Sequence, residues 1–211
     1  MNGNLTVLLI ALVADGNSDR VLLPIIRWAI RELDSNVVFA DAHFRHRSSE
    51  PVSVAIDRVT KEYRPHLVFV HRDAERASLA ERKQEIPKVT GVVPIVPVRM
   101  TEAWLLANEV AIRRASGNPN GRIALDLPSI GKIESIPDPK GELHRVLRLA
   151  SELKGRRLRR LDESAAVHRV AENTEDFRTL RGLAAFVDFE SELAVAYRLA
   201  MSKLQGSAIV V

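Results

Sequence analysis

Cysteine is absent from all 211 residues of the chain. This absence excludes a disulfide-stabilised scaffold, a zinc site with thiolate ligands and a cysteine nucleophile. A chain without cysteine also suits a reducing compartment. We therefore expect a cytoplasmic protein.

No apolar run in the sequence approaches the length of a membrane span. The most hydrophobic stretch, LTVLLIALVADG, is short, has no basic region before it and leads directly into Asp15. A buried strand explains this stretch better than a signal peptide does. We expect no membrane partner.

Several motifs that identify enzyme classes are missing. The sequence contains no Walker A loop, no Gly-x-Gly-x-x-Gly and no His-Glu-x-x-His. His43 and His46 lie three positions apart, but no third ligand is near them in the sequence. They are interpreted as surface residues or phosphate contacts and not as zinc ligands.

The composition is that of an ordinary folded protein. Hydrophobic residues make up 46% of the chain and charged residues 27%, which is enough for a packed core and too apolar for a disordered chain. The net charge of +4 favours an anionic partner only slightly.

Short apolar runs alternate with helical patterns through the first half of the chain. Strands are predicted at 6–13, 36–40, 67–71 and 92–98, with Pro94 and Pro97 placing the last one at an edge of the sheet. Helices are predicted at 21–30, 52–63, from 72 to 85 and at 101–114, where Thr101 is the cap. This alternation predicts an open α/β fold with a mainly parallel four-stranded sheet and helices on both faces.

The composition changes after residue 115. Gly, Asn and Pro cluster in SGNPNG and IPDPKG, which predicts a loop or linker over 116–141. Helical patterns follow at 142–153, 163–171, 175–183 and 189–204. We therefore divide the chain into an α/β domain (1–115), a loop (116–141) and a helical extension (142–211) packed on the sheet.

Acidic residues follow two of the predicted strands. Asp15 comes directly after the first strand, and Asp73 and Glu75 follow the third. Ligands of open α/β sheets bind at the carboxyl ends of the strands, and carboxylate oxygens suit Mg²⁺. The alternative is that these residues only cap helices.

These residues resemble a known family. ALVADGNSDRVLLPIIRWAI and LVFVHRDAER look like the first and second motifs of Toprim domains, which are an acidic residue before Gly and an Asp-x-Asp pair. VPVRMTEAWLLAN, IPDPKGEL and LRGLAAFVDFESEL resemble an uncharacterised family of Toprim-like bacterial proteins over nearly the whole chain. The resemblance implies a Toprim-like (Rossmann-like) fold.

Toprim domains of primases, type II topoisomerases, ribosomal RNA maturases and OLD-type nucleases hold divalent metal against phosphate. The resemblance therefore implies Mg²⁺ (or Mn²⁺) as cofactor and a nucleic acid, DNA or RNA, as partner. It also implies a separate ATPase subunit in an anti-phage or mobile-element system.

The resemblance assigns Asp15, Asp73 and Glu75 as catalytic and metal-binding residues. Asp15 replaces the family's longer Glu, and His71 stands where a carboxylate is common, so His71 is included as a metal ligand. With these two changes we expect one bound ion instead of two. Glu102, at the start of the helix after the fourth strand, is either a catalytic or metal ligand or part of a helix cap.

Basic residues supply candidate phosphate contacts. Arg72 and Arg99 lie beside the acidic motifs, and the densest basic run, KGRRLRR, follows residue 153. The residues of this run that we expect to bind nucleic acid are Lys154, Arg156, Arg157, Arg159 and Arg160. The alternative is a solvated helix end. Trp104 is interpreted as a core residue and not a base-stacking platform.

Two functions are consistent with the sequence. The first is a Mg²⁺-dependent nuclease or related phosphodiester-processing enzyme. The second is a catalytically weakened Toprim-fold module that binds nucleic acid or regulates a partner. The sequence leaves open DNA versus RNA, catalytic competence and oligomeric state.

Overall fold

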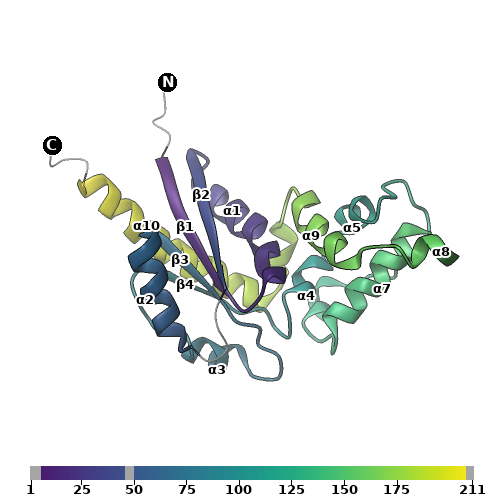
Figure 1. The fold of residues 1–211 in the computed structure, drawn as a ribbon, viewed down its shortest axis with the longest axis horizontal. Helices are drawn as coiled ribbons and strands as arrows, with labels where there is room; N and C mark the ends of the chain where they lie inside the picture. Colours follow the sequence, from purple (N-terminus) through teal and green to yellow (C-terminus); the bar gives the residue numbers. More distant parts are fainter. Residues whose placement is uncertain (1–5, 46–49, 208–211) are drawn as a thin grey trace.

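The computed structural model describes residues 6–45 and 50–207 (Figure 1). His46 and the last four residues of the predicted helical extension, 208–211, lie outside the described residues.

The centre of the fold is a sheet of four parallel strands in the order β2-β1-β3-β4. The strands are β1 (Thr6–Ala14), β2 (Val37–Arg45), β3 (Leu67–His71) and β4 (Val92–Ile95). The α/β class and the parallel sheet predicted from the sequence are confirmed. Pro94 lies in β4 at the edge of the sheet, where its missing N–H leaves no ladder bond unmade.

Alternate residues of each strand point to opposite sides of the sheet, and helices cover both faces. Leu8, Ile10 and Leu12 of β1 belong to the larger core, whereas Ala11 and Val13 belong to a second, smaller core. The larger core contains α1 (Leu22–Leu33) and part of α10 (Ala184–Ser207), and the smaller one contains α2 (Val52–Tyr63). The result is a Rossmann-like arrangement with helices on both faces.

The remaining helices lie mostly in an arm beside the sheet (Figure 1). They are η1 (Asn17–Val21), α3 (Leu79–Gln84), α4 (Glu102–Leu105), α5 (Glu109–Ala115), α6 (Ile130–Ile133), α7 (Pro139–Ser151), α8 (Gly155–Leu158), α9 (Glu163–Asn173) and η2 (Arg178–Gly182). The helices α4, α5, α7 and α9 contact one another, and α9 also contacts η1 and α1. The arm is therefore continuous with the sheet through packed side chains.

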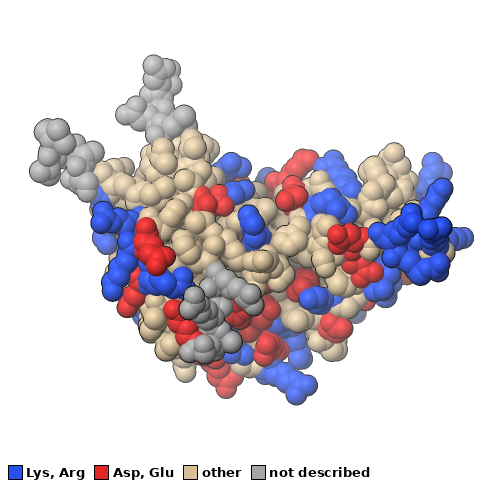
Figure 2. Space-filling model, in the orientation of Figure 1, with Lys and Arg blue, Asp and Glu red and all other residues tan. Residues whose placement is uncertain are grey.

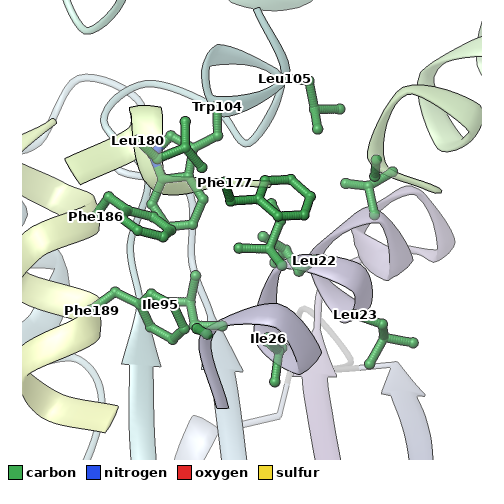
Figure 3. Packing of buried hydrophobic residues seen from close by; sticks show 14 of the residues in the cluster. Leu22, Leu23, Ile26, Ile95, Trp104, Leu105, Phe177, Leu180, Phe186 and Phe189 are labelled. Carbon is green, nitrogen blue, oxygen red and sulfur yellow. The ribbon is translucent and has the colours of Figure 1, made fainter. Parts of the chain in front are cut away.

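Aromatic side chains connect the helical half to the sheet (Figure 3). Trp104 of α4 is 2% exposed, and its ring lies 5.3 Å from that of Phe186 in an edge-to-face contact. Phe189 packs between Trp104 and Phe69 of β3. Trp104 is thus a core residue, as the sequence indicates. Each such aromatic pair contributes about 0.5–1.5 kcal/mol beyond burial.

Several predicted boundaries are wrong. The single helix predicted at 101–114 is two helices, because the Asn108 side chain accepts a hydrogen bond from the backbone N–H of Ala111 and starts α5 anew. The helix predicted from residue 72 begins only at Leu79, after the Ser78 cap. The segment 175–183 contains a short 3₁₀ helix, and α10 starts five residues before the predicted 189.

Two other segments are more ordered than the sequence suggests. β2 extends to Arg45, beyond the predicted end at 40, because it pairs with β1 along its whole length. The predicted loop at 116–141 includes α6 and buries Leu125 and Ile133. Among the described residues, no helix is long and apolar enough to cross a bilayer.

Candidate functional site

The candidate site lies where the loops after β1 and β3 leave the sheet. β1 lies between β2 and β3 in the sheet. The chain therefore passes from β1 to β2 on one side and then crosses back over β1 to β3 on the other side. Neighbouring loops diverge at such a reversal and leave a crevice at the carboxyl ends of the strands. Residues 15–19 and 71–75 occupy that position.

The loop after β1 turns tightly into η1. The Asp19 side chain reaches back and accepts a hydrogen bond of 2.9 Å from the backbone N–H of Gly16. Its other oxygen accepts one of 3.3 Å from the Ser18 hydroxyl. Asp19 is only 9% exposed, and these contacts fix the position of its buried carboxylate.

The loops after β3 and β4 remain paired beyond the ends of the strands. The backbone N–H of Arg72 donates to the carbonyl of Ile95, and the N–H of Glu75 donates to the carbonyl of Arg99. Glu75 and Arg99 both have positive φ, at 52° and 67°, a conformation that side chains other than glycine rarely adopt. This continued pairing brings Thr101 alongside Asp73.

His71 is the centre of a buried polar network. It is 2% exposed and lies at the end of β3. Its Nε2 is 3.1 Å from Oδ1 of Asp73 and 2.9 Å from the Thr101 hydroxyl. Its Nδ1 is 3.5 Å from Oδ2 of Asp19, which is an ion-pair distance without hydrogen-bond geometry. His71 therefore connects the loop after β1 to the loop after β3.

These neighbours keep His71 protonated. Burial by itself lowers the pKa of His71, but the carboxylates of Asp19 and Asp73 outweigh it and raise the pKa to about 9. Burial by itself raises the pKa of Asp19, but its interactions with His71, Gly16 and Ser18 together lower it. At neutral pH the three side chains form a carboxylate–imidazolium–carboxylate row.

The two carboxylate oxygens of Asp73 have different surroundings. Oδ1 accepts hydrogen bonds from His71, from the backbone N–H of Thr101 at 2.9 Å and from the Thr101 hydroxyl at 3.3 Å. No hydrogen bond from a described residue reaches Oδ2. Asp73 is thus oriented through one oxygen, and the other remains available to a ligand.

Glu102, the first residue of α4, is the next carboxylate at this edge. Burial raises the pKa of Glu102, and the negative charges of Asp73 and Asp19 add to the rise. The ammonium group of Lys140, in the first turn of α7, acts in the opposite direction. The structure thus places three carboxylates within electrostatic reach of one another, with Lys140 as a nearby cation.

Asp15 and Glu75 lie beside arginines. Asp15 is 3.2 Å from the Arg72 guanidinium, which also pairs with Glu85, and Glu75 is 3.7 Å from Arg82. Both carboxylates are largely exposed. Within the described ranges, no three His, Asp or Glu side chains form a group that could hold a metal ion. Metal binding by Asp15, Asp73, Glu75 and His71 stays a prediction, and His71 would have to lose its extra proton to act as a ligand.

The candidate phosphate contacts lie in two places, beside the candidate site and at the far end of the arm. Arg72 is engaged in two ion pairs, and Arg99 is half-buried in a loop whose carbonyl is used by Glu75. The basic residues after 153 lie on and around α8 at the far end of the arm. His43 is partly buried on β2, and burial followed by the charge of Arg20 lowers its pKa.

Sequence reasoning missed Asp19, Thr101 as a hydrogen-bond partner, and Lys140. A signal existed for Asp19, which stands four residues after Asp15 in a turn that starts a helix. Thr101 was assigned as a cap, but its hydroxyl is turned to His71 and makes no capping bond. Lys140 is distant in sequence and reaches the site through the contact between α4 and α7.

No family model, no curated protein and no solved structure matches this chain.

Proposed function

We propose that this protein is a Toprim-like enzyme that processes phosphodiesters with Mg²⁺ or Mn²⁺, most simply a nuclease. The observation that carries the proposal is the open Oδ2 of Asp73 at the reversal point of a parallel sheet, with Glu102 within electrostatic reach. The resemblance of the motifs around Asp15 and Asp73 to Toprim domains supports the same chemistry.

The donor set suits Mg²⁺. This ion is commonly held by one or two carboxylates, with water and substrate phosphate oxygens completing its coordination. Asp73 and Glu102 would provide the two carboxylates, and Asp15 and Glu75 would lie at the rim of the site. Burial, and after it the negative charges of Asp73 and Asp19, raise the pKa of Glu102, and a bound cation would favour its charged form. One ion fits this set better than two.

Each neighbouring residue has a defined task in the proposed site. A bound ion would activate water and neutralise charge on the scissile phosphate. His71 and Thr101 fix the orientation of Asp73 through its Oδ1. Asp19 stabilises the protonated form of His71, and Lys140 is positioned to attract the anionic substrate.

The remaining parts of the proposal rest on the family resemblance. The protein would act in the cytoplasm, beside a separate ATPase, in an anti-phage or mobile-element system. The sequence has no Walker A loop of its own, which agrees with a division of labour between two subunits.

One set of contacts favours the alternative function. Asp15 and Glu75, which the resemblance assigns to the metal, are paired with Arg72 and Arg82. A catalytically weakened module that binds nucleic acid or regulates a partner would tolerate such pairing. Metal binding separates the two functions.

The test is a calorimetric titration with Mn²⁺, with nuclease assays on DNA and RNA carried out in parallel. Asp73→Asn keeps an acceptor oxygen for Thr101 and removes the charge, whereas Asp73→Ala also deprives Thr101 and His71 of their partner. We expect one ion bound by the wild type, none by Asp73→Asn and roughly tenfold weaker binding by Glu102→Gln.

Asp57→Asn is the matched control, because Asp57 is an exposed carboxylate on α2. It should bind metal and cleave like the wild type. If Asp73→Asn retains wild-type Mn²⁺ binding or cleavage, the metal site is not at Asp73. If the wild type binds no divalent ion at all, the non-catalytic module is the better description.

A further inference from the structure

A dense group of cations covers the tip of the helical arm. We call it the α8 patch, and it consists of Lys154, Arg156, Arg157, Arg159 and Arg160. All five side chains are exposed, and Figure 2 shows Lys and Arg side chains gathered over α8 at one end of the molecule. The described termini lie at the opposite end (Figure 1).

The chain turns sharply on both sides of α8. Glu152 ends α7 in a left-handed conformation with φ 54°, and Gly155 follows with the same φ. Figure 1 places α8 at the end of the arm, so the α8 patch lies at that end of the molecule.

The acidic residues nearest in sequence are engaged elsewhere. The Glu152 carboxylate accepts hydrogen bonds from the backbone N–H groups of Arg122 and Ile123. Asp162 caps α9 through the N–H of Ala165. These acids are therefore held by backbone groups and leave the cations of the patch unneutralised.

Glu163, the next acidic residue, is also paired away from the α8 patch. Its carboxylate oxygens lie 3.0 Å from His144 and 3.3 Å from Arg148 on α7. No ion pair or side-chain hydrogen bond joins any member of the α8 patch to a described residue. The patch is a source of unbalanced positive charge.

Several arginines elsewhere on the surface are paired with carboxylates, whereas others, such as Arg64 and Arg76, are exposed singly. Arg145 pairs with Glu142, Arg113 with Glu109, and Arg181 with both Glu32 and Glu190. These pairings neutralise the charge of those side chains within the fold. The α8 patch differs in its density, because its five exposed cations lie within residues 154–160 without a described partner, and this concentration of charge points to an external anion.

The residues around the patch restrict the kind of anion. No aromatic residue occurs between Leu105 and Asp176, so the whole arm lacks a platform for stacking unpaired bases. It also lacks the aromatic anchors that are typical of membrane-surface helices. Four of the five cations are arginines, whose planar guanidinium groups bind phosphate oxygens in pairs.

We propose that the α8 patch holds the phosphate backbone of a duplex nucleic acid, without reading its bases, and thereby delivers the duplex to the site at the end of β3. This inference rests on the proposed function for its substrate class. It adds that the substrate is double-stranded and that its binding does not depend on metal.

One feature of the arm favours a different partner. A hollow of about 420 Å³ lies next to α8, with a largely apolar surface formed by residues such as Leu149, Leu153 and Leu158 and with charged residues, among them Lys154, also lining it. An acyl chain of an anionic lipid would suit such a hollow. A vesicle arm is therefore part of the test.

The test measures binding of a labelled duplex of about 30 base pairs by fluorescence anisotropy in EDTA, over a range of salt concentrations. Arg156→Ala/Arg157→Ala/Arg159→Ala removes three charges of the patch. The slope of log K against log salt should become shallower by about 3, because each phosphate contact contributes about 0.9. Affinity at low salt should fall roughly tenfold or more.

The matched control removes the same charge from other surfaces. Lys61→Ala/Lys88→Ala/Arg198→Ala should leave slope and affinity close to those of the wild type, because these side chains are exposed and outside the patch. The triple lysine variant, Arg156→Lys/Arg157→Lys/Arg159→Lys, should keep the slope. A melting curve for each variant checks that it is folded.

Three results overturn the inference. The patch variant binds duplex like the control variant, the wild type binds single strands at least as tightly as duplex, or it binds phosphatidylserine vesicles and not duplex. The outcome is separable from that of the proposed function. If Asp73→Asn binds duplex normally in EDTA but no wild-type cleavage is found, the patch stands and the enzyme does not.

Discussion

Two regions of this molecule concentrate charge in opposite ways. At the end of β3, His71 is buried between Asp19 and Asp73, and the charged groups lie within hydrogen-bond or ion-pair distance of one another. In the α8 patch, five cations are exposed, and none is paired with a described residue.

The difference shows how burial and pairing decide what a charged side chain does. A buried, matched charge has a fixed position and couples strongly to folding, because leaving one member unpaired exposes the other to a low dielectric. An exposed, unmatched charge contributes little to folding and attracts ions from solution. The first region should therefore be sensitive in stability measurements and the second in binding measurements.

The largest effect should come from breaking the buried row. Asp19→Ala leaves protonated His71 with one carboxylate partner instead of two, and we expect the free energy of unfolding to fall by about 3–5 kcal/mol at neutral pH. Urea unfolding of the metal-free protein measures it. Asp57→Ala, at an exposed position on α2, should change stability by less than about 0.5 kcal/mol. Equal effects of the two substitutions would remove the contrast between the regions.

The same row predicts a dependence of stability on pH. Because the pKa of His71 is raised to about 9 in the folded state, against 6.5 for an ordinary histidine, the folded protein binds this proton more tightly. The stabilisation is fully present below about pH 6.5 and is lost as the pH rises through about 9.

The size of that loss should be about 2–4 kcal/mol, from the difference between the two pKa values. Urea unfolding at a series of pH values measures it, and His71→Gln should flatten the profile over this range. If the wild type and His71→Gln respond to pH alike, His71 is neutral in the folded protein and the row is not charged as described.

A smaller effect on stability should distinguish the contribution of the Thr101 hydroxyl from that of its backbone N–H. Thr101→Val removes the contacts of Oγ1 with His71 and Asp73 but keeps the backbone N–H that donates to Asp73. The expected loss in the free energy of unfolding is about 1–2 kcal/mol. Thr101→Ser retains a hydroxyl and should lose less. If valine and serine behave identically, the hydroxyl does not stabilise the network.

The fold was largely predictable because it depends on local patterns. The apolar runs of β1 and β3 and the edge proline of β4, Pro94, are visible in the sequence and indicate a parallel sheet. Element ends were less predictable. The break between α4 and α5 depends on the single side chain of Asn108, and the length of β2 depends on its pairing with β1.

The site was only partly predictable because its contacts join distant parts of the chain. The positions of Asp73 and Glu102 follow from strand ends, which the sequence indicates. The pairing of Asp15 with Arg72 and of His71 with Asp19 depends on which way each side chain turns after its strand. The charge of Lys140 acts on Glu102 only because α7 packs on α4. No local pattern contains this information.

The smallest effect on stability should come from the α8 patch, and it completes the comparison. Arg156→Ala/Arg157→Ala/Arg159→Ala should change the free energy of unfolding by less than about 0.5 kcal/mol, because these side chains are exposed and unpaired. Removing neighbouring like charges should slightly stabilise the arm at low salt, and added salt should remove that gain by screening. Urea unfolding at low and high salt measures both. A loss of several kcal/mol would mean that the patch is held by contacts within the fold, and its charge would then not be available to a duplex.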